Sequence, residues 1–214
     1  AATFTPNETP DGVARVDFDA PLPAGEATLI AEYQAPYNHH LAGLYKVEQG
    51  GLPYLVTQFE DIDARRMFLS FDEPRFKTPY TLTVTAPAAM EVAANGAETE
   101  AEDLGDGMVR HHFATTRPIQ SYLVALMVGP YDKVIGEPIP ATDLRPEAVP
   151  LRGFAPAGKG EKLAAALDIT DEMVEWQESY FDYPYPYGKL DLIAAADFAY
   201  GAMENAGAIV YRES

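Results

Sequence analysis

Two carboxylates and one amide are the side chains of this 214-residue sequence whose positions suggest a chemical task. Glu204 lies in the pentapeptide 201–205, Gly-Ala-Met-Glu-Asn, just after an apolar run at 190–196 that is typical of a strand. A short strand edge with a lone carboxylate suits binding a peptide backbone and its terminal ammonium, because charge-assisted hydrogen bonds are stronger than neutral ones. The alternative is an exposed turn carboxylate that bonds a nearby amide.

Gln58 and Glu60 form the second candidate group. If 58–60 is part of a strand, both side chains point to one face and Phe59 points into the core. Glu60 and Glu204 could then hold one ammonium from two segments, and Gln58 would line the pocket for the neighbouring side chain. The alternative for Glu60 is an ion pair with Arg65 or Arg66, which at a surface contributes only ~0–1 kcal/mol.

The elements that must position these residues differ between the two parts of the chain. Residues 1–150 are expected to be rich in strands, separated by glycine- and proline-containing turns such as Gly50-Gly51 and 105–107. Short strands at this spacing predict a sandwich or folded sheet assembly rather than strand–helix–strand units. The expected strands are 28–33, 44–47, 80–85, 109–114 and 122–128.

The proline-rich stretch 137–150 predicts a domain boundary. After it, apolar residues at helical spacing predict one helix over 161–181, which Pro184 ends. Strands are expected at 189–196 and 208–211. We therefore predict a mainly β fold with a small α+β part, divided into a β-rich domain at 1–150 and a second domain beginning at 151–214.

Composition excludes several classes of function. The net charge of −18 disfavours binding to nucleic acid or to an anionic membrane surface. No apolar run approaches the ~20 residues that a membrane span needs. The sequence has no cysteine, which excludes disulfides and thiolate metal sites. Its four histidines occur as two adjacent pairs, whose rings would face opposite ways on a strand, so no metal site is assigned to this chain.

Several sequence blocks resemble the M1 family of zinc metallopeptidases, the aminopeptidase N and leukotriene A4 hydrolase group. Besides 201–205, they include Gln58-Phe59-Glu60 and Phe71-Asp72-Glu73-Pro74. Ser121-Tyr122-Leu123-Val124-Ala125 and Tyr183-Pro184-Tyr185-Pro186 are similar to further family blocks. They occur in family order over roughly residues 25–214, and such collinear blocks are far more specific than one short motif.

The resemblance implies a β-rich N-terminal domain followed by the start of a thermolysin-like catalytic domain. It implies that Glu204 and Glu60 hold the substrate's α-ammonium. It also implies that Gln58 lines the first pocket and that Gly201, Ala202 and Met203 lie along the peptide backbone. Gly201 is expected to permit close approach and an unusual φ, whereas Met203 could equally be plain core.

The family's zinc site is the element that this sequence lacks. The resemblance implies an H-E-x-x-H helix located C-terminal to the pentapeptide, with its Glu as general base and zinc as the metal of the parent enzyme. No H-E pair occurs in the sequence. We therefore expect this polypeptide to bind no catalytic zinc and to be inactive alone. Two departures from the family pattern are Ala206, where an aromatic is common, and Ser70, where Cys is common.

Two alternatives to an ordinary aminopeptidase remain open from the sequence. The parent could combine epoxide hydrolase and aminopeptidase activities, as one branch of the family does, or the chain could be a non-catalytic β-rich binding module. The expected partners are a peptide N-terminus and the remainder of the catalytic domain, and neither a nucleic acid nor a membrane span is expected.

Overall fold

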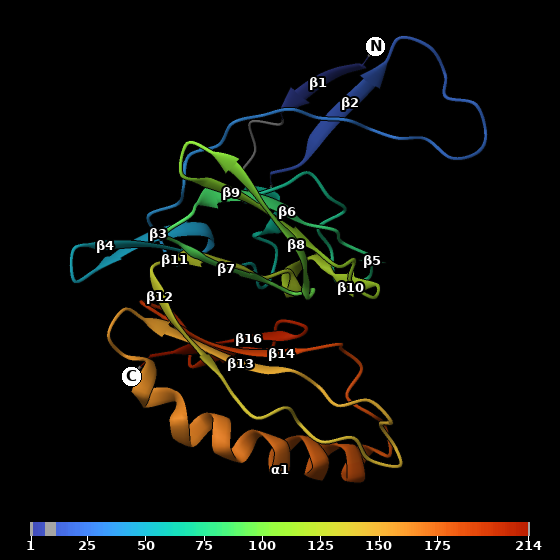
Figure 1. The fold of residues 1–214 in the computed structure, drawn as a ribbon. Coiled ribbons are helices and arrows are strands. Elements are labelled where there is room, and N and C mark those ends of the chain that lie inside the picture. Colours follow the sequence, from blue (N-terminus) through green and yellow to red (C-terminus); the bar gives the residue numbers. More distant parts are fainter. Residues whose placement is uncertain (1, 7–11, 214) are drawn as a thin grey trace.

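The computed structural model describes residues 2–6 and 12–213. Figure 1 shows a β-rich upper part and a lower sheet whose far side carries the long helix. The elements that precede residue 130 are β1 (Ala2–Pro6), β2 (Ala14–Phe18), β3 (Gly43–Gln49), β4 (Leu52–Gln58), the 3-10 turn η1 (Ala64–Arg66), β5 (Lys77–Thr78), β6 (Thr83–Pro87), β7 (Glu91–Ala94), β8 (Glu98–Gly105), β9 (Met108–Phe113), β10 (Ile119–Gln120), η2 (Ser121–Leu123) and β11 (Leu126–Gly129).

The remaining elements form the lower part of the molecule. They are β12 (Tyr131–Ile135), β13 (Leu151–Pro156), η3 (Gly160–Leu163), α1 (Ala164–Phe181), β14 (Leu190–Ala195), β15 (Ala202–Met203) and β16 (Ala208–Arg212). The mainly β fold with a small mixed part is thus confirmed. None of the described helices is long and apolar enough to cross a membrane.

The sheet that carries Gln58 has the strand order β3-β4-β11-β7, and all of its neighbouring pairs are antiparallel. The β3–β4 hairpin turns at Gly50 and Gly51, whose φ values of +60° and +77° require residues that adopt the left-handed region easily. β4 is an inner strand: β11 pairs with Leu55 and Val56 on one side, and β3 pairs with the whole strand on the other, where Gly43 lies opposite Gln58.

Two smaller antiparallel units lie beside this sheet. β6, β9 and β8 form a three-stranded sheet, and β8 and β9 are joined by the predicted turn at 105–107. β5 pairs with β10, and β1 pairs with β2 in a hairpin that stands apart at the top of Figure 1.

A five-stranded mixed sheet carries Glu204. Its order is β12-β13-β14-β16-β15, in which β13, β14 and β16 are parallel and the two edge strands are antiparallel. α1 makes the crossover that two parallel strands need. One face packs against the β3-β4-β11-β7 sheet in a shared core that includes Tyr45, Met127, Ile193 and Val210.

The other face of this sheet packs against α1 (Figure 1). Leu163, Leu167 and Val174 face the sheet and are buried, as helical spacing predicts. Trp176 and Tyr180, which the same spacing allowed as core positions, are 64% and 71% exposed. α1 ends at Asp182 in the left-handed conformation, with φ of 50°, just before Pro184.

Three sequence-based strand predictions need correction. Residues 28–33 alternate but belong to no strand, because they find no partner strand among the described residues. In 80–85, the strand begins only at Thr83. Before it, the carbonyls of Leu82 and Tyr80 accept single hydrogen bonds from the N–H groups of Phe113 and Thr116. In 122–128, the first residues form η2 and only Leu126–Gly129 is a strand.

A buried charge cluster joins the two sheets near the candidate site. Lys189 Nζ donates to Asp191 Oδ2 at 2.6 Å, to the Ala94 carbonyl at 2.6 Å and to the Gly207 carbonyl at 2.8 Å. Arg152 binds the same carboxylate through two bonds of 2.7 and 2.8 Å. Burial lowers the pKa of Lys189 to about 8, although Asp191 opposes that shift. Lys189 therefore ties β7 to the turn that follows Asn205.

Candidate functional site

Glu60 lies two residues beyond the end of β4, at an exposed position. Phe59 is fully buried, as predicted. Because the strand ends at Gln58, the expected alternation does not extend to Glu60, and the Glu60–Asp61 peptide bond is cis. The structure therefore places Gln58 in the interior and Glu60 at the surface beside it, rather than both on one strand face.

Gln58 has an unusual environment for an amide. It is 1% exposed, and neither Oε1 nor Nε2 has a hydrogen-bond partner among the described residues. Most buried side-chain polar atoms in proteins are hydrogen-bonded, and leaving one unpaired costs roughly 1–3 kcal/mol. The structure therefore holds this amide unpaired and closed off from solvent, directly before the exposed Glu60 segment.

The segment after Glu60 is fixed by Asp72, whose residue is 4% exposed. Asp72 Oδ2 accepts from the Arg65 backbone N–H at 3.0 Å and from Arg65 Nε at 2.9 Å, and Oδ1 accepts from Ser121 Oγ at 2.5 Å. Arg66 pairs with Asp63. The alternative pairing of Glu60 with Arg65 or Arg66 is thus not observed.

Glu204 follows β15, the edge strand of the mixed sheet. The Gly201 carbonyl accepts from the Arg212 N–H at 2.9 Å, and Ala202 lies opposite Tyr211. Because hydrogen-bonded pairs alternate along an antiparallel ladder, the N–H and C=O of Ala202 point away from β16. This edge pairs with no other strand in the described part of the chain, so it can take an added strand.

The structure bears on two predictions for the pentapeptide, those for Gly201 and Met203. Gly201 does not adopt a positive φ, so the expected unusual φ is wrong. A Cβ at Gly201 would meet no heavy atom within 4 Å, which leaves open space beside this backbone. The Met203 side chain is 1% exposed within the shared core, so only its backbone lies at the edge.

Asn205 and Asn95 connect the Glu204 turn to η2. Asn205 Nδ2 donates to the Leu123 carbonyl at 3.3 Å and to the Val124 carbonyl at 3.4 Å. Asn95 Nδ2 donates to the Leu123 carbonyl at 2.8 Å and to the Ala206 carbonyl at 2.9 Å. Both partners of Asn205 come from a distant segment, because the tertiary fold brings η2 against the turn.

Tyr122 is a site residue to which sequence reasoning assigned no role. Its pKa is raised, first by burial and then by the charges of Glu204 and Glu60. One hydroxyl therefore lies within the electrostatic range of both candidate carboxylates. The sequence signal was the block 121–125, which resembles the family without showing any chemistry of its own.

The described residues do not fit a zinc site. No group of three or more His, Asp or Glu side chains converges within 2–6 and 12–213 as metal ligands would. His111 Nδ1 lies 2.6 Å from Glu98 Oε1, and this pair lies on the β8–β9 hairpin. The absence of zinc binding by this chain stays a prediction.

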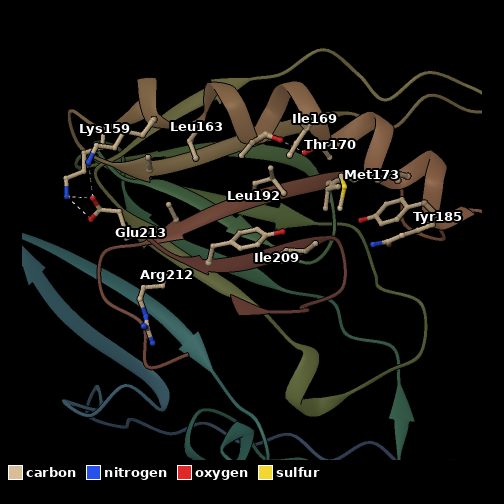
Figure 2. A pocket seen from close by; sticks show the side chains of 18 residues that line it. Lys159, Leu163, Ile169, Thr170, Met173, Tyr185, Leu192, Ile209, Arg212 and Glu213 are labelled. Atoms are coloured by element: carbon tan, nitrogen blue, oxygen red, sulfur yellow. Dashed lines mark hydrogen bonds and ion pairs between the residues drawn. The ribbon is translucent and has the colours of Figure 1, made fainter. Parts of the chain in front are cut away.

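A separate apolar groove of about 440 Å³ lies between α1 and the mixed sheet. Figure 2 shows Leu163 of η3 and Ile169 and Met173 of α1 facing Leu192 and Ile209 of the sheet. Lys159 and Glu213 pair at one end, with Nζ–Oε1 at 2.5 Å. Neither Glu60 nor Glu204 lines this groove, so it is distinct from the candidate site.

The arrangement defines a β-rich domain joined to a mixed sheet whose free edge carries a carboxylate. The profile of the peptidase M1 N-terminal domain matches residues 2–123, and that of the peptidase family M1 domain matches residues 165–214. The chain belongs to peptidase family M1 and corresponds to an N-terminal portion of its members.

Individual relatives agree with this placement. Aminopeptidase M1-C of Oryza sativa subsp. japonica is 36% identical over 207 residues, which cover 95% of this chain and 23% of the relative. Aminopeptidase N of Acetobacter pasteurianus is 33% identical over 217 residues, covering 98% of this chain and 58% of the relative. Endoplasmic reticulum aminopeptidase 2 of Bos taurus is 33% identical over 192 residues, covering 87% of this chain and 19% of the relative. The chain thus spans about a quarter of the length of the first of these relatives.

Proposed function

We propose that this chain is the amine-recognition part of a zinc-dependent M1 aminopeptidase that removes N-terminal residues from peptides. In this proposal, residues 1–150 are the β-rich N-terminal domain and residues 151–214 begin the catalytic domain. The mixed sheet also takes β12, at 131–135, from before that boundary. The two parts therefore share a sheet as well as a core.

The observation that carries the proposal is that the Glu60 and Glu204 segments meet at the turn 121–123. Asp72, which binds Arg65, accepts from Ser121, and Asn205 donates to Leu123. Within the described ranges, neither carboxylate has an ion-pair partner. Two such carboxylates from separate segments are suited to a ligand cation.

The geometry assigns a role to each group. Glu60 and Glu204 would each accept an N–H of the α-ammonium, and this sets how far a peptide enters. Gln58 would contact the first residue. The outward N–H and C=O of Ala202 would pair with the peptide backbone as an added strand. An internal peptide segment offers an amide in place of the ammonium and would lose both charged bonds.

The hydrolytic step requires residues that this sequence does not contain, since it has no H-E-x-x-H motif. We therefore expect the 214-residue chain to release no amino acid from an aminoacyl-anilide, with or without added zinc. A zinc-dependent release of the aniline chromophore by the purified chain would contradict this part of the proposal.

A binding titration tests the recognition role. Leucinamide carries a free ammonium, and N-acetyl-leucinamide is the same molecule without it. A ligand of this size is expected to bind with a Kd of about 1 mM, which NMR titration of the chain at pH 6.5 can measure. We expect binding of leucinamide and none of the acetylated compound. Binding should weaken above pH ~8, where the ligand's own amine loses its proton.

Glu60→Gln and Glu204→Gln are the variants that locate the site. Each should weaken leucinamide binding about tenfold or more, because a hydrogen bond to a charged group contributes roughly 1.5–3 kcal/mol. Glu100→Gln, an exposed position on β8, is the control for the loss of one negative charge. Unchanged affinity in both site variants would favour a non-catalytic binding module instead.

A further inference from the structure

The 3-10 turn η2 lies between the two segments that carry the candidate carboxylates. On one side, Ser121 Oγ donates to Asp72 Oδ1, and Asp72 in turn binds Arg65 of η1, directly after the Glu60 segment. A single buried carboxylate therefore links the position of η2 to that of Glu60.

On its other side, η2 is held by the residues that follow Glu204. The Leu123 carbonyl accepts from both Asn95 and Asn205, and the Val124 carbonyl accepts from Asn205. Asn205 is the immediate neighbour of Glu204. The turn is thus anchored at both ends, to one carboxylate segment each, and Tyr122 is its central residue.

The Tyr122 ring is half-buried and packs against two core clusters. One cluster contains Phe59, next to Glu60, and the other contains Met203, next to Glu204. Its hydroxyl makes no hydrogen bond with the described residues. The hydroxyl is not closed off from solvent, so it is accessible to a ligand.

We propose that Tyr122 is a third ligand of the bound ammonium and the residue that makes the site select primary amines. The inference rests on the proposed amine-recognition role. A primary ammonium has three N–H donors, of which Glu60 and Glu204 accept two. The Tyr122 oxygen accepts the third, and its own proton is donated to one of the carboxylates. A secondary ammonium has one N–H fewer and cannot satisfy all three groups.

The electrostatics of the hydroxyl agree with this role. Burial and the two neighbouring carboxylates all disfavour the phenolate. Tyr122 therefore stays protonated over the range in which an α-amine is protonated, and it keeps both a donor and an acceptor.

The test compares leucinamide with N-methyl-leucinamide by NMR titration of the whole chain at pH 6.5. The unchanged chain should bind the primary amine about tenfold more tightly, since one charged hydrogen bond is lost on methylation. Tyr122→Phe should weaken leucinamide binding about tenfold and leave N-methyl-leucinamide nearly unchanged, so that the preference disappears. Tyr80→Phe, at another half-buried tyrosine packed on the Phe59 cluster, should keep affinity and preference.

The outcomes separate the two proposals. If Tyr122→Phe keeps both affinity and preference while Glu204→Gln loses binding, the amine site stands and the role of Tyr122 is overturned. If the unchanged chain does not distinguish leucinamide from its acetylated form, the amine site is absent and both proposals fall.

A second measurement leaves Tyr122 in place, so it still tests the proposal if Tyr122→Phe does not fold. Titration of the tyrosine ring signals should show a lower pKa for Tyr122 in Glu204→Gln than in the unchanged chain, because one negative charge is removed. An identical Tyr122 pKa in the two proteins would contradict the placement of its hydroxyl beside Glu204.

Discussion

The two carboxylates of the candidate site are held by different kinds of structure. The Glu60 segment is braced by charge, through Asp72, whose side chain is 2% exposed, and Arg65. The Glu204 segment is braced by neutral amides, through Asn205 and Asn95, and by a two-residue edge strand. The difference predicts that loss of the charged contacts destabilises the chain more than loss of the amide contacts.

The largest effect on stability should come from Asp72 and its contacts with Arg65 and Ser121. Asp72→Ala removes the carboxylate that accepts from Arg65 and Ser121, and breaking a buried pair by removing one partner costs roughly 3–5 kcal/mol. Urea denaturation should show this loss in the free energy of unfolding. Glu73→Ala removes a carboxylate whose partner Arg75 is exposed, with side chains 72% and 55% exposed. This control should change stability by less than about 1 kcal/mol.

The next effect concerns the buried Lys189 cluster, which joins β7 to the turn after Asn205. The pKa of Lys189 is lowered to about 8 in the folded chain, against an ordinary value of 10.5, so the unfolded chain binds more protons between these values. Stability should therefore rise between pH 8 and 9.5, by about 1–2 kcal/mol. Above pH ~10, the raised pKa values of Tyr45, Tyr131 and Tyr185 act in the opposite direction.

Lys189→Met isolates that contribution. The variant should be less stable at neutral pH, since two carbonyls lose their donor, and its rise in stability between pH 8 and 9.5 should disappear. Urea denaturation at four pH values measures both. Lys133→Met, which removes a partly exposed lysine paired with Glu91, should keep the rise. A rise that survives in Lys189→Met would show that another group titrates.

A smaller effect on stability is expected from the loss of the Asn205 side-chain amide. Asn205→Ala removes two long hydrogen bonds to η2 and should cost about 1 kcal/mol of stability. Leucinamide affinity should fall several-fold, because Glu204 is no longer held against the turn. If stability falls by 3 kcal/mol or more, the Glu204 segment is as firmly braced as the Glu60 segment, and the contrast between them is lost.

The smallest effect on stability should come from Gly201→Ala. The φ of Gly201 is not positive, and an added Cβ would meet no heavy atom within 4 Å. The free energy of unfolding should therefore change by less than about 0.5 kcal/mol. A peptide paired along the β15 edge would meet the new methyl group. We expect weaker NMR-detected binding of leucyl-leucinamide and little change for leucinamide, whose shorter backbone reaches the edge less.

Local pattern was sufficient for elements whose partners are close in sequence. β3, the turns at Gly50-Gly51 and 105–107 and the helix were predicted because glycine conformation and backbone periodicity act within a few residues. Residues 28–33 show the limit of this reasoning. Their alternation is as regular as that of a true strand, but a strand exists only where another chain segment satisfies its backbone groups.

The site shows the same division. Residue types and family resemblance singled out Glu60 and Glu204 as candidates, because a carboxylate's chemistry is local. Asn205 and Tyr122 could not be placed in the same way. Their roles depend on contacts with segments about 80 residues away in the chain, as in the Asn205–Leu123 bond.

The sequence by itself therefore determined the family and the mainly β fold, and it singled out the two carboxylates as candidates. Only the tertiary structure decided that Gln58 is a buried amide without a partner, that Ala202 faces a free edge and that Tyr122 lies near both carboxylates. The physical reason is that side-chain charge and backbone periodicity are properties of a few neighbouring residues. Burial, edge position and electrostatic neighbourhood are instead properties of segments brought together by the shared core.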